Sequence, residues 1–146
     1  MNTVAQILAS KPDPSVYTMP PGASAQEAVR LMVEKNIGAL VVVDRGQVVG
    51  LVSERDCTRK LVLPARSPTT TLLNDIMSSP VMYVHPRHTS DECMALMTAN
   101  RMRHLPVMDG GQLIGLVSIG DLVKATIAEQ QFIIEQLEHY ITGERG

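Results

Sequence analysis

The sequence contains very few aromatic residues: one phenylalanine, three tyrosines and no tryptophan among 146 residues. A core without large rings has to be built from aliphatic side chains and from the nine methionines, which fill irregular gaps. With 45% hydrophobic and 19% charged residues, the composition is that of a globular chain and excludes general disorder. The length fits one domain of ordinary size, or two small lobes that share a core.

A large excess of charge is also absent, because 13 basic and 15 acidic residues leave a net charge of -2. Without a basic field, bulk binding to nucleic acid is not expected. The two cysteines, Cys57 and Cys93, show neither metal-ligand spacing nor a disulfide framework, which favours a reducing compartment. The N-terminus has no signal-peptide pattern, and no apolar run is long enough to cross a bilayer. We therefore expect a soluble, cytoplasmic protein.

What the sequence does contain is an internal duplication. Residues 16–56 align without a gap onto residues 81–121, and 15 of these 41 positions are identical. Each copy ends in the same segment, Gly50-Leu51-Val52-Ser53-x-x-Asp56 in the first and Gly115-Leu116-Val117-Ser118-x-x-Asp121 in the second. We predict a first repeat with a leading helix (1–63), a linker rich in Pro, Ser and Thr (64–70), a second repeat with a leading helix (71–127) and a C-terminal helical extension (128–146).

The elements expected within each copy follow the order β-α-β-β-α, so the predicted fold class is α/β of the α+β type. For the first copy these are a strand at 16–19, a helix capped by Ser24 and Glu27, strands at 39–43 and 48–52 joined by a hairpin turn, and a helix at 54–63. The leading helices are expected at 3–9 and 71–77. From Leu122 onward a long helix carries an alternating four-and-three pattern, which indicates either packing on its own protein or a homodimer interface: Val123, Ile127, Gln130, Ile134, Leu137 and Ile141.

The end of each copy places a serine hydroxyl and a carboxylate three residues apart at a helix start. One interpretation is purely structural, because Ser53 can cap the helix while Asp56 complements the positive end of its dipole. The other is a nucleotide site. A helix N-terminus attracts phosphate, and the two oxygens of a carboxylate match the cis-diol of a ribose. The pattern alone leaves both interpretations open.

Both copies resemble the cystathionine-β-synthase (CBS) domain, and the chain resembles a free-standing tandem CBS pair. The resemblance rests on the two Gly-Leu-Val-Ser-x-x-Asp segments, on residues 103–107 leading to Asp109, and on the helix at 92–97. It implies that the repeats pack through their sheets around a pseudo-two-fold axis and leave two clefts. It also implies that these clefts bind adenosine-containing molecules: AMP, ADP, ATP, NAD-type dinucleotides or S-adenosylmethionine.

The resemblance also implies a role for each site residue. The aspartate holds the ribose, the serine contacts ribose or phosphate, and adenine lies between aliphatic side chains near the first strand. The predicted ligand-binding residues are Ser53, Asp56, Ser118 and Asp121 at the helix starts, and Val16, Tyr17, Thr18, Val81, Met82 and Tyr83 around the adenine. The copies differ in charge, since Arg103 and His104 occur only in the second, and Arg55 of the first is Gly120 in the second. Such cations suit phosphate, so we predict unequal sites, although each could be an ordinary surface side chain.

The predicted function is a non-catalytic regulatory sensor that binds an adenine nucleotide as a regulatory ligand and forms a homodimer, with a possible protein target. The alternative is a dimeric interaction scaffold whose clefts are vestigial. An enzyme, such as a nucleotide hydrolase, is less favoured because no phosphate-binding loop, activated nucleophile or pair of catalytic carboxylates is present. A metal site at His85, His88 and Asp91 is not expected, because Pro86 places the histidines in a turn.

Overall fold

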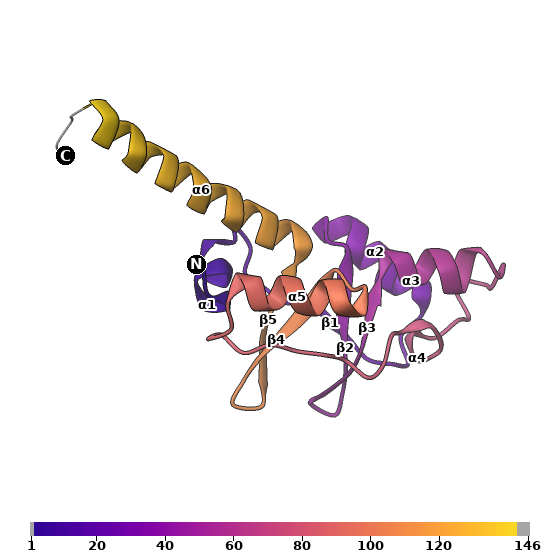
Figure 1. Cartoon of the computed structure of the whole chain (residues 1–146). Coiled ribbons are helices and arrows are strands. Elements are labelled where there is room, and N and C mark those ends of the chain that lie inside the picture. The colour runs from indigo at the N-terminus through magenta and orange to yellow at the C-terminus, as the bar shows by residue number, and fades with distance from the viewer. Residues whose placement is uncertain (1, 143–146) are drawn as a thin grey trace. The chain divides into compact units, whose positions relative to one another are not determined.

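Each of the two repeats contains a β-hairpin, and the two hairpins have identical register (Figure 1). The computed structural model describes residues 2–142. In the first hairpin β2 (Ala39–Asp44) pairs with β3 (Gln47–Ser53), and in the second β4 (His104–Asp109) pairs with β5 (Gln112–Ser118). Even the register shifts coincide, after Val42 in one hairpin and after Val107 in the other. The duplication seen in the sequence is therefore a duplication of structure.

Both hairpin turns have two successive residues with positive φ, as a two-residue type I′ turn requires. These are Gly110 (φ 57°) and Gly111 (φ 80°) in the second turn, and Arg45 (φ 51°) and Gly46 (φ 76°) in the first. The predicted hairpins are confirmed, and the first one holds an arginine in a conformation that glycine adopts at lower cost.

A capped helix follows the first strand of each copy, as predicted. Helix α2 (Ala25–Lys35) begins at Ser24 and helix α5 (Ser90–Asn100) at Thr89, each with a reciprocal capping box. Each helix ends on a residue in the left-handed conformation, Asn36 in α2 and Arg101 in α5. The caps satisfy the free amide groups of the first turn and fix where each helix starts.

The first strand of each copy is shorter than the predicted four residues. In the first copy β1 (Thr18–Met19) runs parallel to β2, and the Val41 N–H donates to the Tyr17 carbonyl at 3.2 Å. The second copy keeps only an isolated bridge between Val84 and Val107. The reason is Pro106, which stands where Val41 stands in the first copy and has no N–H to donate. The element order β-α-β-β-α therefore holds in full for the first copy only.

The leading helices pack on the opposite copy to the one that follows them in the sequence. Helix α1 (Val4–Ser10) groups with residues 83–142, whereas α4 (Leu73–Ile76) groups with residues 15–82. We call residues 15–82 the repeat-1 unit and residues 2–14 with 83–142 the repeat-2 unit. The same hydrogen bonds attach both helices: Ser90 N–H donates to Asn2 and Ala25 N–H to Thr71, each at 2.8 Å.

The two compact units therefore differ from the repeats predicted from the sequence, in which residues 1–63 form one repeat and residues 71–127 the other. The two cores explain the exchange. Val4 and Ile7 are buried in the repeat-2 core with Leu105, Val117 and Leu122, whereas Leu73 and Ile76 are buried in the repeat-1 core beside Leu40, Val42 and Val52.

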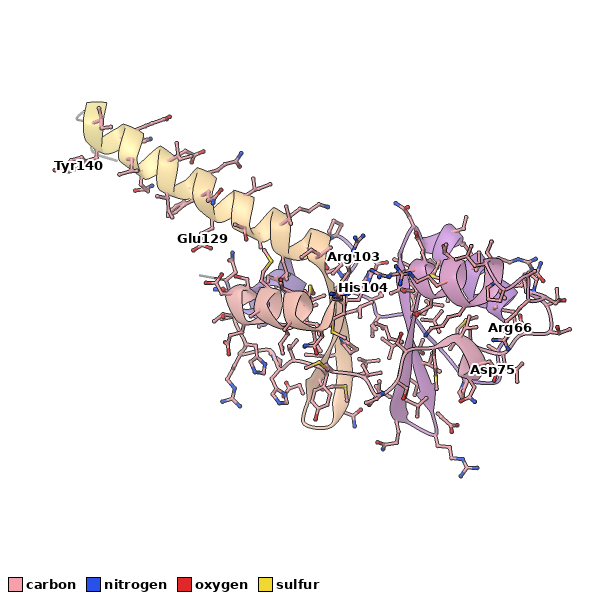
Figure 2. All side chains as sticks on the ribbon, turned by 45° about the vertical axis from the view of Figure 1, so that its right-hand side comes forward. Arg66, Asp75, Arg103, His104, Glu129 and Tyr140 are labelled. Carbon is pink, nitrogen blue, oxygen red and sulfur yellow. The ribbon has the colours of Figure 1, made fainter. Side chains whose placement is uncertain are left out.

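The last helix of each copy starts directly after the serine that both copies share, Ser53 or Ser118. In the first copy α3 (Glu54–Cys57) continues into the π-helical turn η1 (Thr58–Val62), in which Leu63 N–H reaches back five residues to Thr58. The linker then folds back, and Arg66 lies 3.9 Å from Asp75 of α4 (Figure 2). In the second copy α6 (Ile119–Thr142) is the predicted long helix; residues 143–146 of the predicted extension lie outside the described residues.

The fold is thus of the mixed α+β type, with two small sheets and a long C-terminal helix. Among residues 2–142, no helix combines the length and the apolar character needed to traverse a lipid bilayer.

Candidate functional site: two helix-start corners

The first corner lies where β3 ends and α3 begins. The Ser53 hydroxyl oxygen accepts the Asp56 N–H at 3.2 Å. In return, Asp56 Oδ2 accepts the Ser53 N–H at 2.9 Å and the Ser53 hydroxyl at 3.1 Å. The capping interpretation of this motif is therefore confirmed, and it holds the carboxylate in one orientation. Only 8% of Asp56 is exposed.

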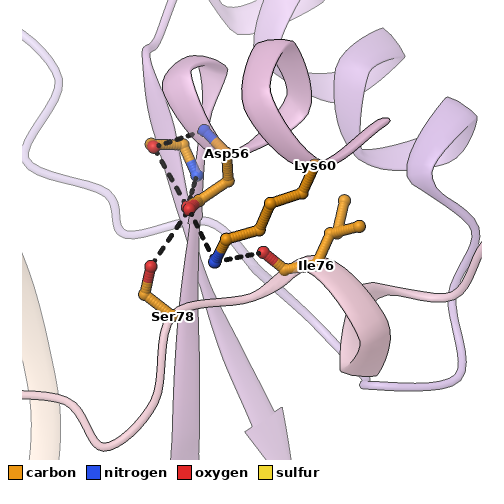
Figure 3. A network of polar contacts seen from close by, with 5 residues as sticks. Asp56, Lys60, Ile76 and Ser78 are labelled. Atoms are coloured by element: carbon orange, nitrogen blue, oxygen red, sulfur yellow. Dashed lines mark hydrogen bonds and ion pairs between the residues drawn. The ribbon is translucent and has the colours of Figure 1, made fainter. Parts of the chain in front are cut away.

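The second oxygen of Asp56 binds groups that the sequence motif does not contain (Figure 3). Oδ1 accepts the Ser78 hydroxyl at 3.0 Å and lies 3.2 Å from Lys60 Nζ, which also donates to the Ile76 carbonyl. The segment after α4 thus closes over the first corner. The spacing of four residues between Asp56 and Lys60 on a helix was a readable signal for the ion pair. Ser78 had no such signal.

The second corner repeats the cap but recruits a different lysine. The Ser118 N–H donates to Asp121 Oδ2 at 2.9 Å, and the Asp121 N–H donates to the Ser118 hydroxyl at 3.1 Å. Lys11, just after α1, places Nζ 3.1 Å from the same Oδ2 and donates to the Leu116 carbonyl. No sequence pattern predicts a pair 110 residues apart. Both oxygens of Asp56 have partners, whereas these contacts of Asp121 all use one oxygen.

Asp121 is ionised at neutral pH. Partial burial by itself raises its pKa, but the Ser118 N–H and the Lys11 ammonium outweigh that effect, so the pKa lies below the ordinary value of an aspartate. The corner therefore keeps a fixed negative charge beside a fixed positive one, a pattern suited to a ligand with both a diol and a phosphate.

His104 lies next to this corner, because it is directly opposite Ser118 in the β4–β5 ladder. Figure 2 labels it beside Arg103. Burial is the main cause that lowers its pKa; nearby Asp121 opposes the shift, while Lys11 and Arg103 add to it. His104 is therefore neutral at pH 7 and can donate or accept a hydrogen bond. Arg103 is exposed, and its carbonyl accepts the Ile119 N–H at the start of α6.

The remaining predicted residues of the first copy lie around β1 and on α3. Thr18 is exposed, whereas Val16 and Tyr17 are half-buried; β2 separates β1 from the strand that ends at Ser53. Lys35 Nζ lies 5.6 Å from the centre of the Tyr17 ring. Arg55 is exposed on α3.

In the second copy Val81 is half-buried, and Met82 and Tyr83 are 36% and 55% exposed. Val81 and Met82 group with the repeat-1 unit and Tyr83 with the repeat-2 unit. The adenine-binding role of all these residues stays a prediction.

Two other features lie outside the corners: a pair of histidines and an apolar groove. His85 and His88 stack with ring centres 5.4 Å apart, and His88 Nδ1 accepts the His85 N–H. No cluster of three metal-ligating side chains exists within residues 2–142. A mainly apolar groove of about 570 Å³ lies between α2, α3 and Pro68 of the repeat-1 unit, and it includes neither Ser53 nor Asp56.

The Lys11–Asp121 pair makes the acid stability of the repeat-2 unit depend on Lys11. Because the folded pKa of Asp121 is lowered, its carboxylate stabilises the fold above the unfolded pKa of about 4, and this is lost as pH falls through the folded value. We expect Lys11→Met to raise the folded pKa of Asp121 and to reduce stability at pH 7 by up to about 1 kcal/mol. Carbon-13 NMR titration of the Asp121 carboxyl group and urea unfolding measure both effects.

Lys60→Met is the matched control, because it removes the ammonium from the other corner. The titration of Asp121 should stay as in the parent protein in that variant. If Lys11→Met left the pKa of Asp121 unchanged, the ion pair between Lys11 and Asp121 would be contradicted.

The chain is similar to known proteins over both repeats. A model of the CBS domain matches residues 4–63 and again residues 73–128. The chain belongs to the CBS-domain family. The resemblance inferred from the two Gly-Leu-Val-Ser-x-x-Asp segments is thereby confirmed, and so is the tandem arrangement of two CBS domains.

Among related proteins, the mitochondrial CBS domain-containing protein CBSX3 of Arabidopsis thaliana is 40% identical over 122 residues, which cover 80% of this chain and 59% of the plant protein. This chain thus spans about three fifths of that relative. A solved structure with CBS domains from Burkholderia ambifaria MC40-6 is 56% identical, with a TM-score of 0.85, and covers 88% of this chain and 96% of that one. The CBS pair of protein MJ0100, solved with 5-methylthioadenosine and S-adenosylmethionine, shares the fold at 24% identity and a TM-score of 0.76, covering 88% of this chain and 98% of that one.

Proposed function

We propose that this CBS pair is a regulatory module that binds an adenosine-containing ligand, with its ribose on Asp121 or Asp56. The observation that carries the proposal is the second corner. There an ionised carboxylate held by a helix cap lies beside the Lys11 ammonium and the neutral imidazole of His104. The two hydroxyls of a ribose would donate hydrogen bonds to the carboxylate, and Lys11 would then be available to a phosphate.

The two corners are expected to differ in their affinity for the ligand. Asp56 is bound through both oxygens by groups of its own chain, so a diol has to displace Ser78 or Lys60 there. Asp121 is more exposed, with 17% of its side chain accessible against 11% for Asp56, and its contacts use one oxygen. We therefore place the tighter site at Asp121, with phosphate contacts from Lys11 and Arg103. The weaker site is at Asp56, where Lys60 and Arg55 are the available cations.

Ligand binding should stabilise the folded protein. A ligand at a hundred times its Kd adds about 2.7 kcal/mol of stability, which raises Tm by several degrees. We expect AMP, ATP or S-adenosylmethionine to do this and UMP to do nothing, as measured by differential scanning calorimetry. Asp121→Asn should weaken binding at least tenfold by isothermal titration calorimetry, while keeping an oxygen for the cap.

Asp109→Asn is the matched control, since it makes the same charge change at an exposed hairpin residue of the same unit. It should bind ligand as the parent protein does. Failure of every adenosine ligand to raise Tm, or normal binding in both Asp121→Asn and Asp56→Asn, would overturn the proposal.

The alternative is an interaction scaffold whose corners are structural only. The lysine bound to each aspartate favours it, because both carboxylates are already neutralised by the chain itself. In that case Asp56→Ala and Asp121→Ala would leave the biological role intact. In either case we propose a homodimer without catalytic turnover that works in the cytoplasm, and an assay for ATP hydrolysis should detect no product.

A further inference from the structure

Helix α6 is much longer than its contacts within the repeat-2 unit require. It has 24 residues, which at 1.5 Å per residue is about 36 Å. Leu122 near its start is fully buried, and Ala125 accepts a hydrogen bond from Asn2. From Gln130 to Ile141 every residue is exposed, and in Figure 1 this half of the helix extends past α1 and α5.

The two sides of α6 have different surroundings. One side faces α1, where Ala125, Ala128 and Phe132 line a shallow groove with Ile7 and Ser10. The other side carries a continuous row of side chains, which we call the outer stripe. It consists of Val123, Ile127, Gln130, Ile134, Leu137 and Ile141, and its five apolar members are 43% to 80% exposed.

The spacing of the outer stripe is that of a two-helix seam, with alternate steps of four and three. Taking Ile127, Ile134 and Ile141 as a positions makes Val123, Gln130 and Leu137 the d positions. The flanking e positions are then Lys124, Gln131 and Glu138. An exposed seam of this kind fits another helix with the same repeat.

The charged residues beside the outer stripe indicate which helix is the partner and whether the two helices run parallel or antiparallel. In an antiparallel pair of two α6 helices the e positions of one helix face the e positions of the other. Lys124 of each copy then meets Glu138 of the other copy. The Gln131 side chains of the two copies meet at the two-fold axis of the pair. The same register puts Val123 against Ile141 and Ile127 against Leu137. A parallel pair would instead place Glu138 beside Ile133 of the other copy and leave Lys124 without an opposite charge.

We propose that α6 is a dimerisation helix, and that its outer stripe pairs antiparallel with the outer stripe of a second copy of this chain. The pairing buries five apolar side chains per copy and matches two pairs of opposite charge. It does not depend on whether the corners bind a ligand.

A charge-exchange cycle in the full chain tests both the partner and the direction. Lys124→Glu sets Glu against Glu, and Glu138→Lys sets Lys against Lys, so each should weaken the dimer about fivefold in sedimentation velocity. The double variant exchanges the charges and should return the Kd to within about twofold of the parent. In a parallel pair residues 124 and 138 do not meet, so the two losses would simply add.

Leu137→Asp removes the apolar contact at the seam and should weaken the dimer more than tenfold. Glu135→Lys is the control, because it changes the charge on the same helix outside the seam and should leave the Kd unchanged. Gln131→Cys should form a disulfide-linked dimer on mild oxidation, since the native Cys57 and Cys93 are buried. A monomeric parent protein, as would follow if the stripe covered its own chain or a different protein, overturns the proposal. So does a dimer that Leu137→Asp leaves intact, or a double charge variant that is not restored.

Discussion

Replacing Ile7 by alanine is expected to destabilise the second repeat, although in the sequence Ile7 lies in the leading helix of the first. Its side chain is 2% exposed and belongs to the core that contains Leu105, Val117 and Leu122. Truncating a buried isoleucine removes its transfer free energy and leaves a cavity, which together cost about 2 to 5 kcal/mol. Hydrogen exchange measured by mass spectrometry should therefore speed up in peptides from β4 and β5 more than in those from β2 and β3.

Ile76→Ala is the reciprocal experiment within the same chain. Ile76 occupies the same place on α4 as Ile7 does on α1, and it is fully buried in the repeat-1 core. Here β2 and β3 should exchange faster than β4 and β5. If Ile7→Ala accelerated hydrogen exchange mainly in β2 and β3, each leading helix would pack on the repeat that follows it. The packing of each leading helix on the opposite repeat would then be wrong.

Gly115→Ala is expected to lower stability by about 1 kcal/mol even though the new side chain is a single methyl group. A Cβ at this position would lie 2.8 Å and 2.9 Å from the two Cδ atoms of Leu8, closer than real Cβ atoms come to their neighbours. Overpacking of this kind displaces side chains and backbone at that cost. Gly50 is its twin, since a Cβ there would collide with Met77. Urea unfolding of both variants measures the loss.

Two controls separate this collision from other effects of replacing glycine. Gly22 has no atom within 4 Å of an added Cβ, so Gly22→Ala should change stability by less than about 0.5 kcal/mol. The double variant Leu8→Ala with Gly115→Ala should be less destabilised than the sum of the single variants, because the smaller residue 8 makes room for the methyl group. Strict additivity would show that Leu8 and Gly115 do not meet.

The two glycines of the repeated motif have a role that the sequence did not reveal. Gly50 and Gly115 stand in the segments that identify the family, and the resemblance assigned function only to the serine and aspartate that follow. The structure adds a packing role, since each glycine makes room for a leading helix. The serine and aspartate are also a capping box, which was one of the two interpretations open from sequence.

The predicted features that the structure confirmed all act over a few residues. Ser24 and Thr89 cap helices through groups three residues away, and Gly46 and Gly111 permit turns between adjacent strands. These interactions are decided by neighbours in the chain, so the residue types are enough to predict them.

By itself the sequence determined the duplication, the order of the elements, the caps and the family. The tertiary structure alone decided which leading helix covers which hairpin, and that Lys11 is the lysine that pairs with Asp121. The physical reason is that the two hairpins are nearly equivalent. Each has a glycine at the same place, Gly50 or Gly115, and a similar apolar surface, so local interactions cannot determine which hairpin a leading helix packs on. Only the path of the chain through space brings Lys11 to Asp121, whereas the spacing of four residues already favours the pair of Lys60 and Asp56.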